Sequence, residues 1–229
     1  EPFTQWVVED SFCSGRPAFE KAGAIVVDEV APFENMKLRM LNGSHSTLAY
    51  LGYLRGYETV AEAVADPKLA TLIHDMMTQE IIPTLKMAID ADLDAYRDAL
   101  LNRFRNPALK HRTWQIAMDG SQKLPQRLLE TIRDRISAGE PFERLTFGVA
   151  GWMRYVTGTD LSGNSIDVRD PMAEQLRKIG EYNQDDAVGL IRAYTGLEAV
   201  FGNDLGQNED FIANVTAAYL SEFNGENPR

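Results

Sequence analysis

Cysteine is nearly absent from this sequence, and long hydrophobic runs are absent altogether. Cys13 is the only cysteine among 229 residues, which excludes an intrachain disulfide and fits a reducing cytoplasm. We expect Cys13 to pack rather than to act as a nucleophile, because a reactive thiol needs a nearby base. No apolar stretch approaches the roughly 20 residues that cross a bilayer, and no signal-peptide pattern opens the chain. These absences argue against membrane insertion and export.

Basic residues are also in the minority. The chain has 23 Lys and Arg against 34 Asp and Glu, a formal net charge of −11. This balance argues against a nucleic-acid partner, because phosphate binding depends on Lys and Arg. Glycine-rich dinucleotide and phosphate loops do not occur, and neither do the HExxH and CxxC spacings of metal sites. We therefore expect neither a metal site nor a dinucleotide-binding domain in these residues.

What is present is a helical pattern with a substantial core, since 44% of the residues are hydrophobic. Two β-like runs, 5–8 and 24–30, come first, and helical periodicity dominates after Pro32. The helices we expect are 35–57, 60–65, 69–88, 93–104, 107–118, 125–138, 142–157, 171–179, 184–194 and 209–223.

Capping patterns support several of these limits. Asp66, Asn106 and Asp170 each precede a proline at an expected first helical position, where the missing N–H costs nothing. Residues 145–155 are apolar nearly all round, which predicts a central helix with neighbours on several sides. Gly148 and Gly151 in that helix would permit close helix packing.

Polar side chains gather in the segment E-N-M-K-L-R-M-L-N-G-S-H, residues 34–45. If the segment is helical at about 100° per residue and Lys37 is set to zero, Glu34, His45 and Asn42 lie at about 60°, 80° and 140°. The four side chains then share one face with apolar neighbours, which predicts a partly dry pocket.

These groups suit the oxidation of a secondary alcohol or the reduction of a ketone. A desolvated Lys37 loses affinity for its proton and can act as a general base near neutral pH. Asn42 can donate an N–H to a developing alkoxide, and His45 can hold a hydroxyl. Glu34 can pair with Lys37 or relay its proton to water.

A purely structural interpretation of the same segment is open. Lys37 and Arg39 would be solvated side chains, Asn42-Gly43 would end one helix, and Ser44 would cap the next.

The spacing Lys37-x4-Asn42-x2-His45 resembles the signature of the long-chain mannitol dehydrogenase family, which includes mannitol 2-dehydrogenase, arabinitol dehydrogenase, and the fructuronate and tagaturonate reductases. The resemblance runs through four ordered parts of the chain. They are E-P-F-T-Q-W-V-V-E-D at 1–10; V-A-P-F-E-N-M-K-L-R-M-L-N-G-S-H at 30–45; N-P-A-L with D-G-S-Q-K-L-P-Q-R at 106–109 and 119–127; and G-W-M-R-Y-V-T-G-T-D with D-P-M-A at 151–160 and 170–173.

The resemblance implies a mainly α fold, namely the multi-helical C-terminal catalytic and substrate-binding domain of a two-domain dehydrogenase, at 33–229. Residues 1–32 would be a short β-containing remnant of, or linker from, a Rossmann domain that is not in this chain. That domain would bind most of the cofactor NAD and would supply a second oxyanion asparagine. We therefore expect a fragment of a longer protein that does not turn over substrate alone.

The resemblance also implies roles for individual residues. In the family, the lysine matching Lys37 is the general base, and the asparagine matching Asn42 helps to form the oxyanion hole. The histidine matching His45 binds substrate, the glutamate matching Glu34 is linked to proton exchange, and the lysine matching Lys123 contacts substrate.

Gln115 departs from part of the family. Eight residues before Lys123, the sugar-alcohol dehydrogenases typically carry an arginine that contacts substrate, so Gln115 favours the uronate branch that contains fructuronate reductase. A hexuronate needs a cation for its carboxylate. The candidates are Lys123, His111, Arg112 and Arg127. On the expected helix 107–118, His111 and Arg112 lie four and three residues before Gln115, although Arg112 and Arg127 also fit simple surface charges.

Three functions remain open at this point. The leading one is the catalytic domain of an NAD-dependent oxidoreductase that interconverts a sugar alcohol or aldonate with a ketose or keto-uronate, with fructuronate and mannonate as the favoured pair. The second is mannitol 2-dehydrogenase activity on mannitol and fructose. The third, from a different class, is a stand-alone helical module that binds a ligand or partner without catalysis.

Overall fold

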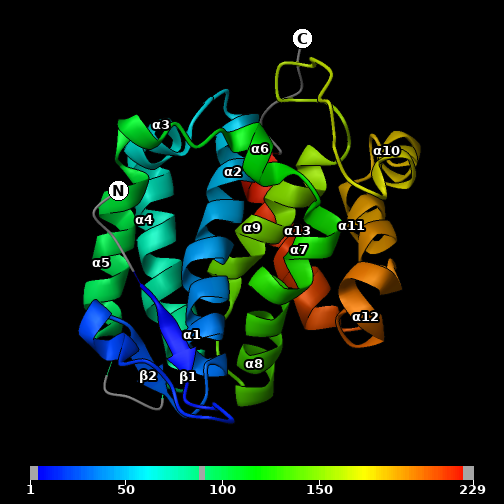
Figure 1. Ribbon diagram of the computed structural model, residues 1–229. Helices are drawn as coiled ribbons and strands as arrows, with labels where there is room; N and C mark the ends of the chain where they lie inside the picture. Colours follow the sequence, from blue (N-terminus) through cyan, green and yellow to red (C-terminus); the bar gives the residue numbers. More distant parts are fainter. Residues whose placement is uncertain (1–4, 88–90, 224–229) are drawn as a thin grey trace.

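The computed structural model describes residues 5–87 and 91–223, and most of them are helical (Figure 1). This confirms the mainly α fold. The α-helices in chain order are α1 Ala31–Met36, α2 Ser44–Leu54, α3 Val60–Ala65, α4 Pro67–Asp75, α5 Leu93–Phe104, α6 Thr113–Ala117, α7 Gly120–Leu124, α8 Glu130–Ala138, α9 Glu143–Tyr155, α10 Ala173–Tyr182, α11 Ala187–Thr195, α12 Glu198–Gly206 and α13 Glu209–Phe223.

Three π-helical segments and several 3₁₀ turns join these helices. The π-helical segments are η2 Lys37–Gly43, η3 Met76–Ile81 and η6 Pro125–Leu129, and the 3₁₀ turns are η1 Phe19–Ala22, η4 Ile82–Thr84 and η5 Pro107–Leu109. Each π-helical segment follows one α-helix without a break, so the helical backbone runs through α1, η2 and α2 and again through α7, η6 and α8.

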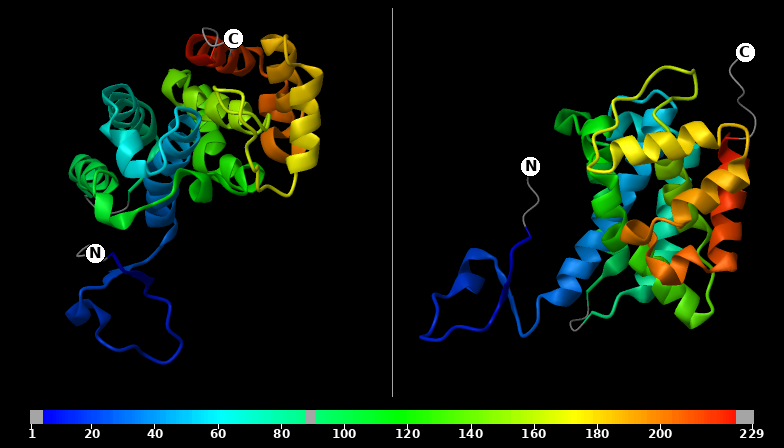
Figure 2. Two further views of the ribbon diagram at one scale, coloured as in Figure 1. Left: turned by 90° about the horizontal axis from the view of Figure 1, so that it is seen from above. Right: turned by 90° about the vertical axis from the view of Figure 1, so that its right-hand side faces the viewer.

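The β structure is small and lies at the beginning of the chain. Strands β1 Val7–Glu9 and β2 Ile25–Val27 pair in parallel, with Val8 opposite Val26, which confirms the two β-like runs. This part projects from the helical body beside the start of α1 (Figure 2). Cys13 lies between the strands and is exposed, so the expectation that it packs in the interior is wrong.

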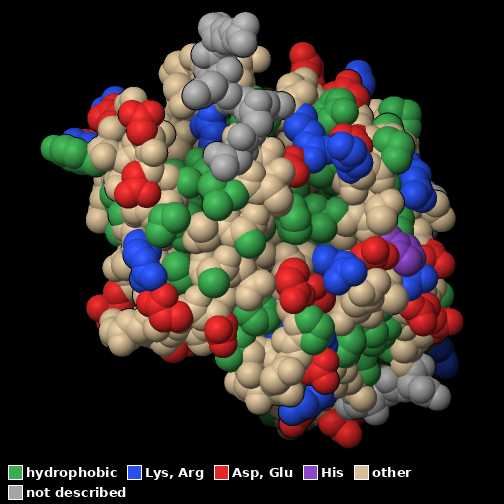
Figure 3. Space-filling view, turned by 180° about the vertical axis from the view of Figure 1, so that it is seen from behind, with side chains coloured by type: hydrophobic (Ala, Val, Ile, Leu, Met, Phe, Trp, Pro, Cys, Tyr) green, Lys and Arg blue, Asp and Glu red, His purple; other side chains and the backbone are tan. Residues whose placement is uncertain are grey.

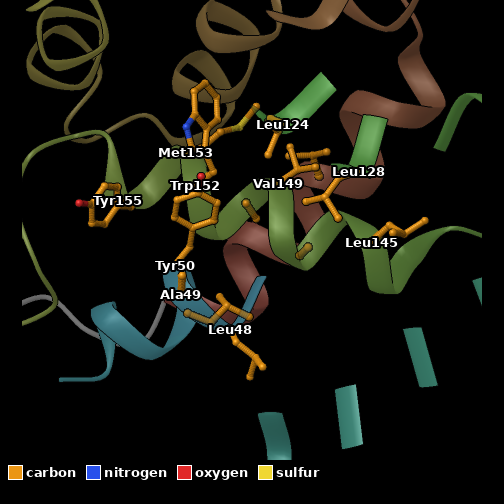
Figure 4. Close-up of a cluster of buried hydrophobic side chains, with 14 of the residues drawn as sticks. Leu48, Ala49, Tyr50, Leu124, Leu128, Leu145, Val149, Trp152, Met153 and Tyr155 are labelled. Carbon is orange, nitrogen blue, oxygen red and sulfur yellow. The ribbon is translucent and has the colours of Figure 1, made fainter. Parts of the chain in front are cut away.

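Helix α9 is the centre of the core, as its all-round apolar sequence predicts. It packs against α2 and α13, and its Trp152 is fully buried. Close contact with α2 depends on two glycines of α9. A Cβ on Gly151 would lie 2.9 Å from the Leu51 side chain, and one on Gly148 would collide with the Thr47 hydroxyl. Figure 4 shows side chains of α2 and α9 meeting in this cluster.

The expected helix 107–118 is wrong, because tertiary pairing interrupts it. After the single 3₁₀ turn η5, Lys110 adopts a left-handed conformation with φ 46°. The next residues then extend alongside residues 58–60. The Val60 N–H donates to the His111 carbonyl at 2.9 Å, and the Thr113 N–H donates to the Glu58 carbonyl at 3.0 Å. Helix α6 begins only at Thr113.

Other limits differ from the sequence expectations by local rearrangements. Asp66 caps α4 as expected by accepting the Lys68 N–H at 2.8 Å. Asp170 instead binds the Ser121 hydroxyl and the Met172 N–H, and α10 starts later than expected, at Ala173. Helix α12 was not expected from the sequence, and it contains Gly202 at φ 68°. The expected helix end at 88 and the domain end at 229 lie outside the described residues.

Three further observations concern the surface charges, the helix lengths and the clustering of metal-binding side chains. On the face seen in Figure 3, acidic and basic side chains are interspersed. None of the helices within residues 5–87 and 91–223 combines the length and apolarity needed to cross a bilayer. The same described ranges contain no cluster of three or more His, Cys, Asp or Glu side chains arranged to hold a metal ion.

Candidate active site

The segment that carries Lys37, Asn42 and His45 is one uninterrupted helix. Gly43 has φ −62° and ψ −48°, and Ser44 has φ −62° and ψ −41°, so both residues are helical. The alternative in which Asn42-Gly43 ends one helix and Ser44 caps another is therefore wrong. We call the helical run 31–54, formed by α1, η2 and α2, the catalytic helix, after the role that the sequence resemblance predicts for Lys37 and Asn42.

Gly43 stays helical because another part of the chain packs directly against it. A Cβ at Gly43 would lie 2.7 Å from the carbonyl oxygen of Arg127 and 3.4 Å from the Leu128 side chain. Any larger residue would push η6 away. The glycine that is poor helix material by local propensity thus permits contact between the catalytic helix and η6.

The π-helical segment changes the register of the candidate side chains Lys37 and Asn42. In an α-helix, Asn42 would lie about 140° round the axis from Lys37. Lys37 and Asn42 are both in η2, and in a π-helix hydrogen bonds join residues five apart. Asn42 therefore lies closer to one full turn from Lys37 than an α-helix would place it. The angles calculated for a regular α-helix underestimate how nearly these two residues share a face.

The side chains differ in exposure along the catalytic helix. Glu34 and Lys37 are exposed, whereas Asn42 and His45 are partly buried. The described residues therefore do not supply the dry surroundings expected for Lys37. The described residues do provide dry surroundings for the His45 ring.

His45 sits in an aromatic and cationic environment. Its ring packs on Phe104, with centroids 4.5 Å apart, and meets the edge of the His111 ring at 5.5 Å. Its Nε2 atom is buried without a hydrogen-bond partner among the described residues. Burial first, and then the charges of His111, Arg127 and Arg103, lower the pKa of His45 to about 3. His45 is therefore a neutral imidazole at neutral pH.

Lys123 and Arg127 come from α7 and η6, which pack beside the catalytic helix. The Lys123 ammonium donates to the Met118 carbonyl at 2.7 Å and lies 3.6 Å from the Asp119 carboxylate. Arg127 is partly buried, and its Nη1 donates to the Ser46 hydroxyl at 3.0 Å. The interpretation of Arg127 as a solvated surface charge is therefore wrong.

The structure separates the other expected substrate contacts. Arg112 is exposed and forms an ion pair with Glu58 at 2.6 Å, so it fits a surface charge. His111 contacts His45, but it lies before α6 and not on a shared helix with Gln115. Gln115 is exposed on α6. The expectation that His111 or Arg112 restores positive charge on the helical face of Gln115 is wrong, because the chain is extended through both residues.

Two residues of this region were not singled out from the sequence. Ser46 binds Arg127, and Phe104 covers the His45 ring. Neither contact has a signal in sequence spacing, because both join elements that are far apart in the chain.

The fold and the site together define a helical domain that carries an amine, an amide and a neutral imidazole along one helix. The particular family follows from comparison with known proteins. Residues 29–222 match the model of the mannitol dehydrogenase C-terminal domain. The chain belongs to this family, as the sequence resemblance predicted.

Individual relatives agree with this assignment. The chain is 56% identical over 219 residues to D-mannonate oxidoreductase of Escherichia coli (strain K12), covering 96% of this chain and 45% of the relative. It is 39% identical over 221 residues to a mannitol 2-dehydrogenase of Aspergillus fumigatus, covering 95% of this chain and 43% of the relative. The chain thus spans a little under half the length of these curated relatives.

A solved structure shares the fold. The ternary complex of Pseudomonas fluorescens mannitol 2-dehydrogenase with NAD and D-mannitol superposes with a TM-score of 0.87 and 36% sequence identity. The match covers 96% of this chain and 44% of that one.

Proposed function

We propose that this chain is the catalytic and substrate-binding domain of an NAD-dependent oxidoreductase. The enzyme would interconvert the secondary alcohol of a sugar alcohol or aldonate with the carbonyl of a ketose or keto-uronate. The observation that carries the proposal is the uninterrupted catalytic helix, which presents Lys37, Asn42 and His45 in a chain of this family. The relatives named D-mannonate oxidoreductase and mannitol 2-dehydrogenase support the reaction class.

Each residue of the helix has a distinct task in this proposal. Lys37 accepts the hydroxyl proton during oxidation and returns it during reduction. Asn42 donates an N–H to the oxygen while negative charge develops on it. His45, which is neutral, forms a hydrogen bond with a substrate hydroxyl. Exposed Glu34 passes the proton of Lys37 to solvent. Lys123 is a further substrate contact.

NAD would supply the acceptor for the hydride of the substrate carbon that carries the reacting hydroxyl. We assign no described residue to this cofactor. Exposed Lys37 fits a reaction that takes place between this domain and a nucleotide-binding domain, which would cover the lysine and limit its contact with water. This chain covers 45% of the D-mannonate oxidoreductase and 44% of the mannitol 2-dehydrogenase chain, and the additional length of these relatives supports a Rossmann domain as the partner. With its single cysteine, the enzyme is proposed to work in the cytoplasm.

For the substrate we favour the fructuronate and mannonate pair. Glutamine at position 115 and the 56% identity to a D-mannonate oxidoreductase support a hexuronate. The second candidate is mannitol and fructose, which is favoured by the fold match to a mannitol 2-dehydrogenase bound to D-mannitol.

The test is a side-by-side assay of the natural two-domain protein with each pair of substrates, following NADH. We expect kcat/KM for fructuronate to exceed that for fructose by about 100-fold, the scale of a lost charged contact in a closed site. Equal or better use of fructose would establish the second candidate instead. Failure to act on any of the four compounds would overturn the proposed activity as a whole.

A further inference from the structure

Arg127 is held firmly against the catalytic helix. Its carbonyl oxygen is the atom that an added Cβ at Gly43 would meet. Its guanidinium reaches one turn further, to the Ser46 hydroxyl, 3.0 Å from Nη1. Both ends of the residue are thus positioned by the helix that carries Lys37, Asn42 and His45.

The hydrogen bonds of this guanidinium are incomplete. An arginine has five N–H donors, and among the described residues only Ser46 receives one of them through the side chain. The Nε atom is buried without any partner, and no carboxylate in the described part of the chain pairs with Arg127. Burial lowers the pKa of the Arg127 guanidinium from its ordinary value, in keeping with the few partners that its N–H groups have.

Proteins seldom leave such a charge unmatched. A partly buried cation loses hydration and regains the free energy only through an anion or several good acceptors. A neutral serine hydroxyl provides one acceptor. The arrangement is chemically complete only when an anion of fitting geometry is bound, and a carboxylate matches the guanidinium with two parallel hydrogen bonds.

The location points to the substrate as the source of that anion. Ser46 follows His45 directly, and the positive charge of Arg127 is one of those that act on the His45 ring. Asn42 and Ser46 are one helical turn apart, about 6 Å along the axis, which is comparable to an extended six-carbon chain. In fructuronate the reacting carbonyl and the carboxylate lie towards opposite ends of such a chain.

We propose that Arg127, oriented by Ser46, is the specificity-determining residue that binds the carboxylate of the aldonate or keto-uronate substrate. This inference rests on the proposed oxidoreductase function and names a residue for substrate selection within it. From the sequence, Lys123, His111 and Arg112 were candidates beside Arg127. Arg112 already pairs with Glu58, and Lys123 already binds the Met118 carbonyl and lies near Asp119.

The experiment compares Arg127→Gln and Arg127→Lys in the two-domain protein, each assayed with mannonate and with mannitol. For Arg127→Gln we expect kcat/KM for mannonate to fall about 100-fold, mainly through KM, because a charged hydrogen bond is lost. The value for mannitol should fall by less than about 10-fold, and Arg127→Lys should recover part of the mannonate value. Arg177→Gln is the matched control, since Arg177 is exposed and pairs with Glu181.

The ratio of the two kcat/KM values within one preparation is the decisive quantity, because a partly unfolded sample lowers both values equally. An unchanged ratio in Arg127→Gln would overturn the assignment of Arg127 while leaving the oxidoreductase function intact. A raised KM for NAD with an unchanged ratio would assign the guanidinium to the dinucleotide and would also overturn it. A wild-type protein inactive on both substrates would overturn the proposed function and this inference together.

Discussion

Gly43 of the catalytic helix lies against the backbone of Arg127, so close that a Cβ at Gly43 would be 2.7 Å from the Arg127 carbonyl oxygen. This contact joins the helix of Lys37, Asn42 and His45 to the segment that carries Arg127. Glycine is disfavoured in helices by local propensity. At position 43 it nevertheless sets how closely the helix of Lys37, the proposed general base, approaches Arg127, the residue proposed to bind the substrate carboxylate.

Gly43→Ala should destabilise the protein although alanine is the better helix former. Helix propensity favours alanine by about 1 kcal/mol, but the new methyl group must displace rigid backbone, and overpacking typically costs about 1–3 kcal/mol. We expect a net decrease in the free energy of unfolding, measured by urea denaturation. Lys37→Ala, an exposed change in the same helical run, should stay within about 0.5 kcal/mol of wild type. A more stable Gly43→Ala protein would contradict the close packing of η6.

Lys37→Ala should lower kcat of the two-domain enzyme by at least about 100-fold, the scale of general acid–base catalysis. An added small primary amine should restore part of the activity, since it can accept the same proton. Lys178→Ala serves as the matched control, because Lys178 is a surface lysine that pairs with Glu174. Near-normal turnover by purified Lys37→Ala would remove Lys37 from the mechanism.

Asn42→Ala should act mainly on kcat, by about 100-fold, because an oxyanion donor stabilises the transition state more than the bound substrate. Steady-state kinetics with the preferred substrate would measure it. Asn35→Ala, at an exposed position earlier in the helix, should leave both constants near wild type. A rise in KM with unchanged kcat would identify Asn42 as a simple binding residue.

Burial of His45 should lower the free energy of unfolding of the protein as the pH falls from neutral to mildly acidic. The pKa of His45 is about 3 in the folded protein against an ordinary 6.5, so the unfolded chain binds a proton over this range and the folded protein does not. The stability is therefore fully present above about pH 6.5 and is lost as the pH falls towards 3. Between pH 7 and pH 5 the loss from this group is about 2 kcal/mol.

Thermal or chemical unfolding of His45→Gln at several pH values would measure this contribution. The variant should lose less stability than wild type on going from pH 7 to pH 5. His74→Gln is the control, since the His74 side chain is 45% exposed, and the loss of stability assigned to His45 should persist in it. Parallel curves for His45→Gln and wild type would contradict the buried, neutral state of His45.

Much of the fold was accessible from sequence because it depends on local chemistry. Periodic apolar residues predicted the central helix α9, and its two glycines predicted close packing. Asp66 before a proline predicted the start of α4, where the aspartate accepts the Lys68 N–H. The spacing of Lys37, Asn42 and His45 identified the family and the segment of interest. These features involve residues within one or two helical turns of each other, so the linear order contains them.

The tertiary structure decided what depends on distant parts of the chain. Pairing with residues 58–60 interrupts the helix expected through His111, and packing of η6 keeps the backbone helical at Gly43, where local propensity allowed a break. The burial of Arg127 beside Ser46 follows from the same packing. Contacts between distant residues, such as Ser46 and Arg127, which are 81 positions apart, leave no periodic trace in a single sequence. Their energies nevertheless outweigh local preferences of about 1 kcal/mol.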